Sequence, residues 1–454
     1  MSSKITRFRI EKLHNVRTID VAIIDNTLIL VGENGTGKST VANFIYFFLT
    51  KQWRRMLEYD FKSVLAKIND EEIKIDREDL AGSIPKKSRD RIHLPSSIRH
   101  RIESYIAVND LVHPSFSELE PLADELGIPP HILIEYISTT RRGFRIISEK
   151  ISDIEEKIDG IFSEQVLYLP TYRRIEQDLR SIFPYASSAI SELREGIRRR
   201  AKDASFIELV EFGMEDVERI IEQKMTEIKD NVRDGLNTLT GTYLRDVIRG
   251  EYQTADLLPS LTDLDEETID AIFSRIPQAI LSLREQKRPR EIIKKIQKTG
   301  EIDEEDKVVA HFLTQLVSLH EAQQEDEKDV REFIKLCNDY LSEEKRLIYD
   351  NLKFDISIVQ RIGEESQNLS MKMLSSGEKQ IVSLFSQIYL SGVSGFFLII
   401  DEPELSLSMP WQKRFLPDIN NTNRCNGIVA VTHSPFIFDN DLDPYAHSIE
   451  EFIE

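Results

Sequence analysis

Residues suited to phosphate chemistry stand near both ends of this 454-residue chain. The N-terminal set follows the spacing G-x-x-x-x-G-K-[ST] between an apolar run and a helical pattern. Glycines at this spacing let backbone N–H groups wrap a phosphate. Lys38 would reach the β- and γ-phosphates of ATP and take part in catalysis, and the Ser39 hydroxyl would bind Mg²⁺. The residues predicted to contact ATP are Gly32, Glu33, Asn34, Gly35, Thr36, Gly37, Lys38, Ser39 and Thr40.

Two adjacent carboxylates follow an apolar run near the other end of the chain. The run 397–400 reads Phe-Leu-Ile-Ile and is followed by Asp401 and Glu402. Ligands of open α/β sheets bind at the carboxyl edge of the strands. Successive strand residues point to opposite sides, so the two acids have different tasks. Asp401 is predicted to hold Mg²⁺ and Glu402 to polarise the attacking water; the alternative is an acidic turn after a core strand.

A helix start between these two sets offers a second place for a phosphate. Ser375 and Glu378 have the S-x-x-E spacing of a capping box. A helix start carries free N–H groups and a partial positive charge. Taken alone, the segment is a well-capped helix. Beside the other motifs, we predict that Ser375, Ser376 and Gly377 contact the nucleotide.

The elements that must position these residues predict one α/β head built from both chain ends. Residues 4–31 indicate a hairpin and a buried strand, and residues 39–57 a helix. Residues 61–77 indicate a strand pair that turns at residues 69–70, and residues 166–170 a core strand. Strands and helices alternate again over 376–389, 396–400, 411–419 and 428–431.

A helical, highly charged insertion is predicted between the two ends. Its pattern breaks near Gly241, Gly250, Pro259 and Pro289, and we expect no extended coiled coil because of these interruptions. The predicted parts are an N-terminal head part at 1–186, with a helical sub-insertion at about 85–160, a helical insertion at 187–345 for oligomer and partner contacts, and a C-terminal head part at 346–454.

Composition limits the cellular compartment and the kinds of binding partner that we expect for this protein. No apolar run approaches the roughly 20 residues that span a bilayer, and two cysteines give no disulfide framework, so we expect a cytoplasmic protein without a membrane partner. A net charge of −20 repels nucleic acid at long range. Any contact with DNA would use local basic patches, at 198–200 or at 287–295; the alternative is that both are solvated helix faces balanced by acids.

The ordered motifs resemble those of ABC-type ATPases of the SMC, Rad50, RecF and OLD kind. Residues 32–39 match the Walker A loop and Asp401-Glu402 the Walker B motif. Residues 374–378 resemble the ABC signature, with Ser376 and Glu378 where Gly and Gln are usual. Residues 406–407 stand at the D-loop position, and His433 matches the switch histidine. The resemblance covers about 1–180 and 345–454.

This resemblance implies an ABC-type P-loop ATPase head with a large helical insertion, using ATP and Mg²⁺. It also implies a homo-oligomer of head-to-head dimers, in which Ser375 and Gly377 of one copy contact the γ-phosphate held by another copy and His433 senses that phosphate. Thr171 stands where a Q-loop Gln is usual, and Gln165 and Gln177 are out of register. The Q-loop ligand therefore stays unassigned.

The wording of 401–407 and 432–435 is similar to the ATPase subunits of two-gene anti-phage systems such as Septu and PARIS. No nuclease motif is visible, and Asp441-Leu442-Asp443 is interpreted as a solvated loop. The leading hypothesis is therefore an ATPase switch subunit that controls a separate effector nuclease of HNH or Toprim type. The alternatives are a DNA-repair or DNA-binding ATPase of RecF or SMC type, and a scaffold that uses ATP structurally with little turnover.

Overall fold

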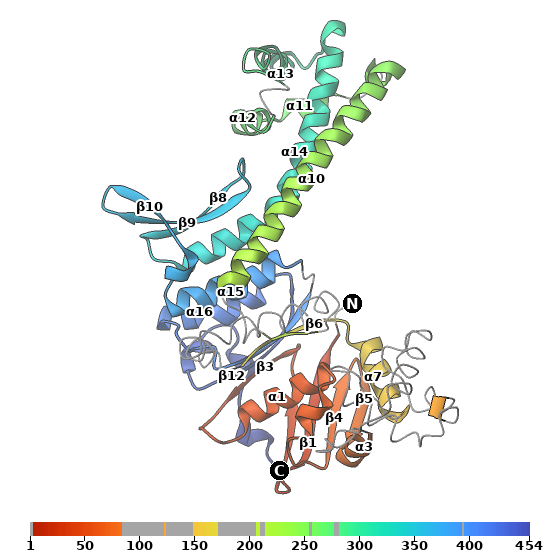
Figure 1. The fold of residues 1–454 in the computed structure, drawn as a ribbon, viewed down its shortest axis with the longest axis vertical. Coiled ribbons are helices and arrows are strands. Elements are labelled where there is room, and N and C mark those ends of the chain that lie inside the picture. Colours follow the sequence, from red (N-terminus) through yellow and green to blue (C-terminus); the bar gives the residue numbers. More distant parts are fainter. Residues whose placement is uncertain are drawn as a thin grey trace, which may run out of the picture. The chain divides into compact units, whose positions relative to one another are not determined.

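The computed structural model divides the chain into two compact units (Figure 1). Unit 1 comprises Met1–Glu211 and Ser394–Glu454, and unit 2 comprises Phe212–Val393. The residues that the structure describes are 3–83, 122–123, 149–170, 206–208, 214–253, 257–276, 281–392 and 395–454. The predicted fold class is confirmed: an α/β head is built from both chain ends, and a large, mainly helical insertion separates them.

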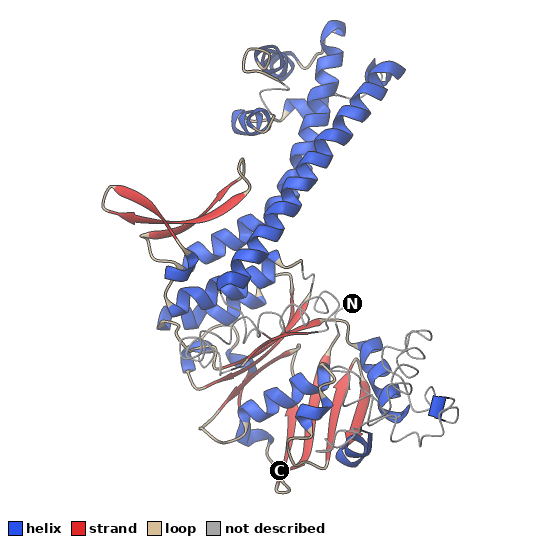
Figure 2. Cartoon of the chain, in the orientation of Figure 1, coloured by secondary structure: helices blue, strands red, loops and turns tan. Residues whose placement is uncertain are grey.

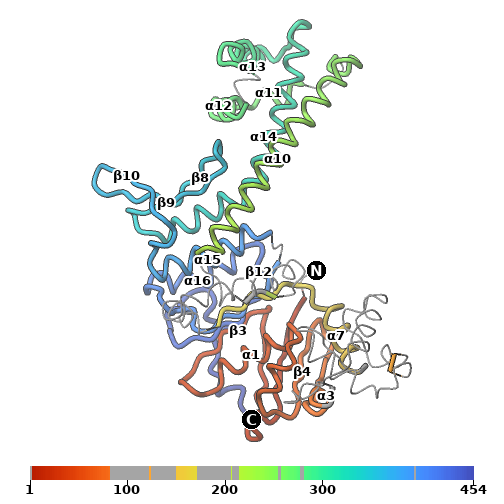
Figure 3. The backbone as a smooth tube through the Cα atoms, in the orientation of Figure 1, coloured from red at the N-terminus to blue at the C-terminus, as the bar shows by residue number. Residues whose placement is uncertain are grey.

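A parallel sheet of six strands forms the centre of unit 1, in the order β13-β3-β12-β11-β6-β7. Every neighbouring pair in this sheet is parallel. Strands from the two chain ends are mixed in it, because β3 lies between β13 and β12, which Figure 3 shows as red and blue segments side by side. β11 is buried along its whole length, as expected of a strand covered on both faces. The strands are β3 (Thr27–Val31), β6 (Gln165–Leu169), β7 (Phe206–Glu208), β11 (Phe396–Asp401), β12 (Cys425–Thr432) and β13 (Ala446–Ser448).

An antiparallel sheet in the order β2-β1-β4-β5 completes the core of unit 1. Helix α1 packs against the parallel sheet, and its Phe48 meets Phe8 of β1 edge-on, with ring centroids 5.7 Å apart. The strands are β1 (Ile5–Leu13), β2 (Arg17–Ala22), β4 (Ser63–Ile68) and β5 (Glu71–Asp76). The helices are α1 (Lys38–Leu49), α2 (Trp53–Met56), α3 (Arg77–Ser83), α7 (Glu149–Ile161) and α16 (Met409–Asn420).

The strand patterns predicted for the N-terminal 80 residues are confirmed, and the predicted helix 39–57 is interrupted. The turn between β4 and β5 falls at Asn69 and Asp70, whose φ angles are 49° and 67°. The helix stops at Leu49 because Lys51 adopts a φ of 56°, which a helix cannot continue through. Residues 53–56 then form the short α2.

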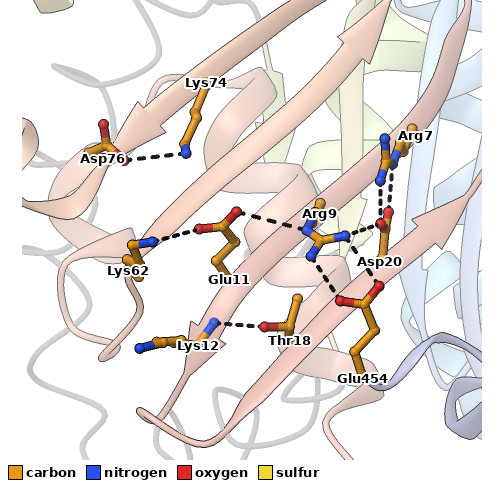
Figure 4. A network of polar contacts seen from close by, with 10 residues as sticks. All are labelled: Arg7, Arg9, Glu11, Lys12, Thr18, Asp20, Lys62, Lys74, Asp76 and Glu454. Atoms are coloured by element: carbon orange, nitrogen blue, oxygen red, sulfur yellow. Dashed lines mark hydrogen bonds and ion pairs between the residues drawn. The ribbon is translucent and has the colours of Figure 1, made fainter.

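A charged network covers the outer face of β1 and β2 (Figure 4). Arg7 and Arg9 both donate hydrogen bonds to Asp20, and Arg9 also binds the side chain of Glu454. These contacts, chiefly the hydrogen bond from Arg7, lower the pKa of Asp20. The backbone N–H of Glu454 donates to Thr18 O at 2.8 Å, so the C-terminal segment continues this face of unit 1.

Two long helices dominate unit 2, and Figure 2 shows them as a packed antiparallel pair. α10 (Met214–Arg249) has 36 residues and α14 (Lys307–Tyr340) has 34, which corresponds to about 50 Å of helix each. A three-stranded antiparallel sheet in the order β10-β9-β8 follows α14. The other elements are α11 (Leu258–Thr262), α12 (Glu266–Ser274), α13 (Lys287–Thr299), β8 (Lys345–Asp350), β9 (Asp355–Ile362), β10 (Glu365–Leu369) and α15 (Ser376–Leu390).

The long helix pair corrects one sequence-based prediction. α10 continues through Gly241, so the predicted break there is wrong; the expectation of no extended coiled coil, which rested partly on that break, stays a prediction. A Cβ atom at Gly235 would lie 2.5 Å from Leu319 Cδ1; glycine at this position therefore allows α10 and α14 to approach closely. The break at Gly250 is confirmed by its φ of 72°. Pro289 lies in the first turn of α13, where proline is tolerated.

The second basic patch, at residues 287–295, lies on α13. Arg288, Arg290, Lys294 and Lys295 all form ion pairs with acidic residues, which favours the balanced solvated face over a nucleic-acid patch. The first patch, residues 198–200, lies outside the described residues, as do Thr171, Gln177 and most of the predicted sub-insertion 85–160. Among the described residues, no helix is long and apolar enough to cross a membrane.

The compact units do not coincide with the predicted functional parts. Residues 346–392, assigned from the sequence to the C-terminal head part, belong to unit 2 together with the long helices. The helix that carries the predicted signature, α15, packs against α10 and α14. The functional boundaries at 186 and 345 stay predictions.

Candidate nucleotide-binding site

The loop between β3 and α1 has the backbone shape that its glycines allow. Gly32, Gly35 and Gly37 have φ angles of 152°, 79° and 102°, a range that side-chain-bearing residues rarely adopt. The Thr36 hydroxyl donates to Glu33 O at 2.8 Å and closes the loop on itself. Glu33, Asn34 and Gly35 are exposed, so the loop backbone is open to a ligand. Thr40 follows in the first turn of α1.

Lys38 is the buried cation of this loop. Its side-chain nitrogen donates hydrogen bonds to Gly32 O at 2.9 Å and to Glu33 O at 2.7 Å. Only 4% of Lys38 is exposed, and this burial lowers the pKa of the ammonium group, with Asp401, Glu402 and Glu404 opposing the shift. Neutral carbonyl oxygens hold the ammonium in place, and a phosphate oxygen would offer it a stronger, charge-assisted partner.

Ser39 and Asp401 are brought together from opposite ends of the sequence. The Ser39 hydroxyl donates to Asp401 Oδ1 at 3.1 Å, across a separation of 362 residues. The sheet order explains the contact, since β12 alone separates β3 from β11, and the loop and Asp401 both leave the carboxyl ends of parallel strands. A hydroxyl and a carboxylate are hard oxygen ligands that suit Mg²⁺. Among the described residues, no group of three or more His, Cys, Asp or Glu could hold a metal alone, so Mg²⁺ here would also need phosphate or water oxygens.

The segment after Asp401 has an unusual backbone. Glu402 and Ser406 have φ angles of 51° and 67°, and non-glycine residues in this region carry strain on the order of 1–3 kcal/mol. The Glu402 N–H donates to Val431 O at 2.8 Å, which ties the predicted water-polarising residue to the neighbouring strand β12. Such strained positions cluster at functional sites.

His433 follows β12 and is exposed, while its backbone is held firmly. Its N–H donates to Glu404 Oε1 at 2.8 Å, and the next residue, Ser434, donates its hydroxyl proton to Gln412 Oε1 at 2.6 Å. Sequence reasoning did not assign Glu404 or Gln412. Neither has a distinctive spacing, and their partners lie 22 to 29 residues further along the chain.

The predicted signature residues lie in unit 2, and the capping box is confirmed. The Ser375 N–H donates to Glu378 Oε2 at 2.7 Å, and the Glu378 N–H donates to Ser375 Oγ at 3.3 Å. Ser375 and Ser376 are exposed, and Gly377 is buried. The chain thus presents an ordered helix start at this position.

Lys345 adds an ion pair to this helix start that the sequence did not reveal. Its side-chain nitrogen lies 3.0 Å and 3.1 Å from the two carboxylate oxygens of Glu378. Burial alone raises the pKa of Glu378, but hydrogen bonds from Ser375 and the Lys345 cation outweigh it and lower that pKa. Glu378, which stands where the predicted signature usually has Gln, is therefore paired with Lys345 and favoured in its ionised form.

These features define a P-loop nucleotide-binding protein of the α/β class: a glycine-rich loop joins a parallel strand to a helix, and an acidic strand end lies beside it. The sequence family described as the AAA ATPase domain matches residues 4–438. The chain belongs to this family.

Comparison with curated proteins and with solved structures gives the following matches. No curated protein matches the chain. The Smc head domain of Pyrococcus furiosus, solved with an extended coiled coil and bound to the C-terminal domain of ScpA, is 12% identical, with a TM-score of 0.37 over 96% of this chain and 91% of that chain. The Smc head domain of Pyrococcus yayanosii, solved with a coiled coil and joint, is 15% identical, with a TM-score of 0.30 over 96% and 93%.

Proposed function

We propose that this protein binds and hydrolyses ATP with Mg²⁺ and acts as a switch. The observation that carries the proposal is the contact between Ser39 and Asp401 beside the buried ammonium of Lys38. Phosphate, hydroxyl and carboxylate oxygens would complete a Mg²⁺ site at this place, and bound Mg²⁺ would neutralise charge on the phosphates.

Each predicted residue has a separate task in the proposed reaction. The backbone N–H groups of the loop 32–37 hold the phosphates, and Lys38 moves its hydrogen bonds from loop carbonyls to phosphate oxygens. Glu402 polarises the attacking water, and His433 contacts the γ-phosphate. Ser375, Ser376 and Gly377 of a second copy complete the site with the start of α15, whose partial positive charge suits a phosphate.

We further propose that ATP pairs two heads and that hydrolysis separates them, in a cytoplasmic anti-phage complex that controls a separate HNH or Toprim nuclease. Two observations support this role: the described residues contain no group of three or more His, Cys, Asp or Glu of the kind that could hold a nuclease metal, and unit 2 supplies a large helical surface for partners. A gene for such a nuclease beside the gene of this protein would support the defence role.

A DNA-binding ATPase of RecF or SMC type is the second candidate. The long pair α10 and α14 favours it, whereas the net charge of −20 and the paired cations of α13 oppose it. A gel shift across a salt series separates the two, because phosphate contacts weaken steeply with salt. Turnover at saturating ATP separates both from a scaffold that only binds ATP.

Two substitutions test the proposed reaction. Lys38→Ala should abolish nucleotide binding. Glu402→Gln should keep binding, lower turnover by roughly 10²–10⁴-fold, as expected for loss of a general base, and accumulate an ATP-bound dimer measurable by light scattering. Glu450→Gln, an exposed acid of the same unit, is the control. Wild-type turnover by the Glu402 variant would show that the assigned base is wrong.

A further inference from the structure

One carboxylate links the Walker B segment to the switch histidine, and the proposed reaction gives it no task. Glu404 uses both of its oxygens: Oε2 accepts a hydrogen bond from Thr432 Oγ1 at 2.7 Å, and Oε1 accepts one from the His433 N–H at 2.8 Å. Thr432 has no exposed surface. Glu404 lies in the loop that follows β11. From there it accepts hydrogen bonds from two consecutive residues at the end of β12.

A second tie lies on the other side of His433. Gln412 accepts the hydrogen bond from the Ser434 hydroxyl at 2.6 Å and donates its own amide to Leu407 O at 2.9 Å. The loop 402–408 and the segment 432–434 are thus joined at two points. The His433 side chain is exposed. The hydrogen bonds of its backbone N–H and of the neighbouring Ser434 therefore fix the backbone position from which the imidazole projects.

The same loop carries the strained positions Glu402 and Ser406. A strained backbone persists only when surrounding contacts over-determine it, and Glu404 lies between these two positions. The tie to β12 thus has two consequences: it supports the loop that presents Glu402, and it places the backbone of His433.

We propose that Glu404 is a positioning residue that sets Glu402 and His433 at a fixed spacing on either side of the γ-phosphate. This inference rests on the proposed ATP hydrolysis. Glu404 acts through hydrogen-bond geometry and touches no reacting atom in this arrangement.

The geometry makes the conservative variant informative. In Glu404→Gln, the amide oxygen can still accept from the His433 N–H. The amide nitrogen can donate to Thr432 Oγ1, because a hydroxyl offers two acceptor positions as well as its proton. Thr432 Oγ1 already accepts from the Ser434 N–H at 3.0 Å, which leaves one position for the new bond. Glu404→Gln therefore keeps both hydrogen bonds to residues 432 and 433 but removes the negative charge. Glu404→Leu removes both hydrogen bonds with a side chain of similar size.

The experiment compares Glu404→Gln, Glu404→Leu, His433→Ala and the double variant Glu404→Leu/His433→Ala. We expect Glu404→Leu to lower kcat roughly a hundredfold, the scale of a misplaced catalytic group, while the KM for ATP stays within about threefold. Glu404→Gln should keep turnover within about threefold of wild type, because it preserves both hydrogen bonds. The double variant should be no slower than the slower single variant, since Glu404 acts through the residues it places.

Amide hydrogen exchange at His433 gives a readout that needs no ATP turnover. Glu404→Leu should speed this exchange and Glu404→Gln should not. A Glu404→Gln variant as slow as Glu404→Leu would mean that the charge matters, and unchanged exchange in Glu404→Leu would mean that the tie is absent; either result overturns the inference. A wild-type protein without ATP turnover would instead refute the proposed function, while the exchange measurement would still decide whether Glu404 holds His433.

Discussion

The contacts around the nucleotide loop and the capping contacts of α15 differ in the sequence distance that they span. In unit 1, Ser39 contacts Asp401 over 362 residues, and Glu404 reaches Thr432 over 28 residues. In unit 2, Ser375 and Glu378 cap each other within one helical turn. The contact between Ser39 and Asp401 thus requires both chain ends in one sheet, whereas the capping box at the predicted signature forms within the first turn of one helix.

Two buried charged groups, one in each unit, also differ in what they are paired with. Glu327 of α14 has no exposed surface and accepts hydrogen bonds from Arg275 and Arg331. Around the unit 1 loop, in contrast, the Lys38 ammonium is held by neutral carbonyl oxygens. The charge of Glu327 is thus balanced by direct partners within the protein, whereas the direct partners of Lys38 are neutral and would yield to an anionic ligand. We therefore expect substitution of Glu327 to act on stability and substitution of Lys38 to act on nucleotide binding.

The largest effect on stability should follow from Glu327→Ala. The substitution leaves Arg275, whose side chain is 7% exposed, buried without its carboxylate, and breaking a buried pair in this way costs about 3–5 kcal/mol of the free energy of unfolding. Urea unfolding measures the loss. Nucleotide binding by the folded protein should be unchanged.

Glu325→Ala is the matched control on the same helix. Glu325 is 77% exposed and forms an ion pair with Lys328 at 3.5 Å, so its loss should cost less than about 1 kcal/mol. Equal losses for the two variants, or loss of nucleotide binding by folded Glu327→Ala, would break the comparison between the units.

Local patterns in the sequence predicted much of the fold and the chemistry of the site. The strand before Gly32, the acids after β11 and the capping box of Ser375 each depend on neighbouring residues, and parallel strand ends then place Ser39 near Asp401. The continuation of α10 through Gly241 was missed because packing against α14 outweighs the low helix propensity of glycine, a cost of about 1 kcal/mol.

The missed residues of the site share one property: their partners are distant in the sequence. Glu404 is joined to Thr432, and Lys345 to Glu378 across 33 residues. A carboxylate after a Walker B motif, or a lysine at the start of a strand, has no periodicity that identifies such a partner. Only the folded chain shows these pairs.

A smaller effect is expected from Lys345→Met, which removes the cation beside Glu378. A hydrogen bond to a charged group contributes about 1.5–3 kcal/mol, so the free energy of unfolding should fall by up to that amount at neutral pH. Lys353→Met is the control, since Lys353 is 80% exposed and pairs with Asp350 at the surface.

The pH dependence sharpens this test. The pKa of Glu378 is lowered in the folded protein, so its contribution to stability is complete above the unfolded pKa of about 4.3 and is lost as the pH falls through the folded value. The difference between wild type and Lys345→Met should therefore shrink in acid, where a protonated Glu378 needs no cation. A difference that stays constant from neutral pH to acid would show that Lys345 stabilises unit 2 by packing alone.

The smallest effect compares one helix cap from each unit. Ser375 caps α15 through its hydroxyl, at a rather long 3.3 Å, so Ser375→Ala should lower the free energy of unfolding by about 0.5–1 kcal/mol. Ser408 begins α16 of unit 1 without a side-chain cap hydrogen bond, so Ser408→Ala should cost clearly less. Both serines are exposed and have similar backbone angles, which makes them a matched pair for thermal unfolding. If Ser408→Ala cost as much as Ser375→Ala, the hydroxyl of Ser375 would not be what stabilises the start of α15. The stability of that helix start would then rest on Glu378 and Lys345.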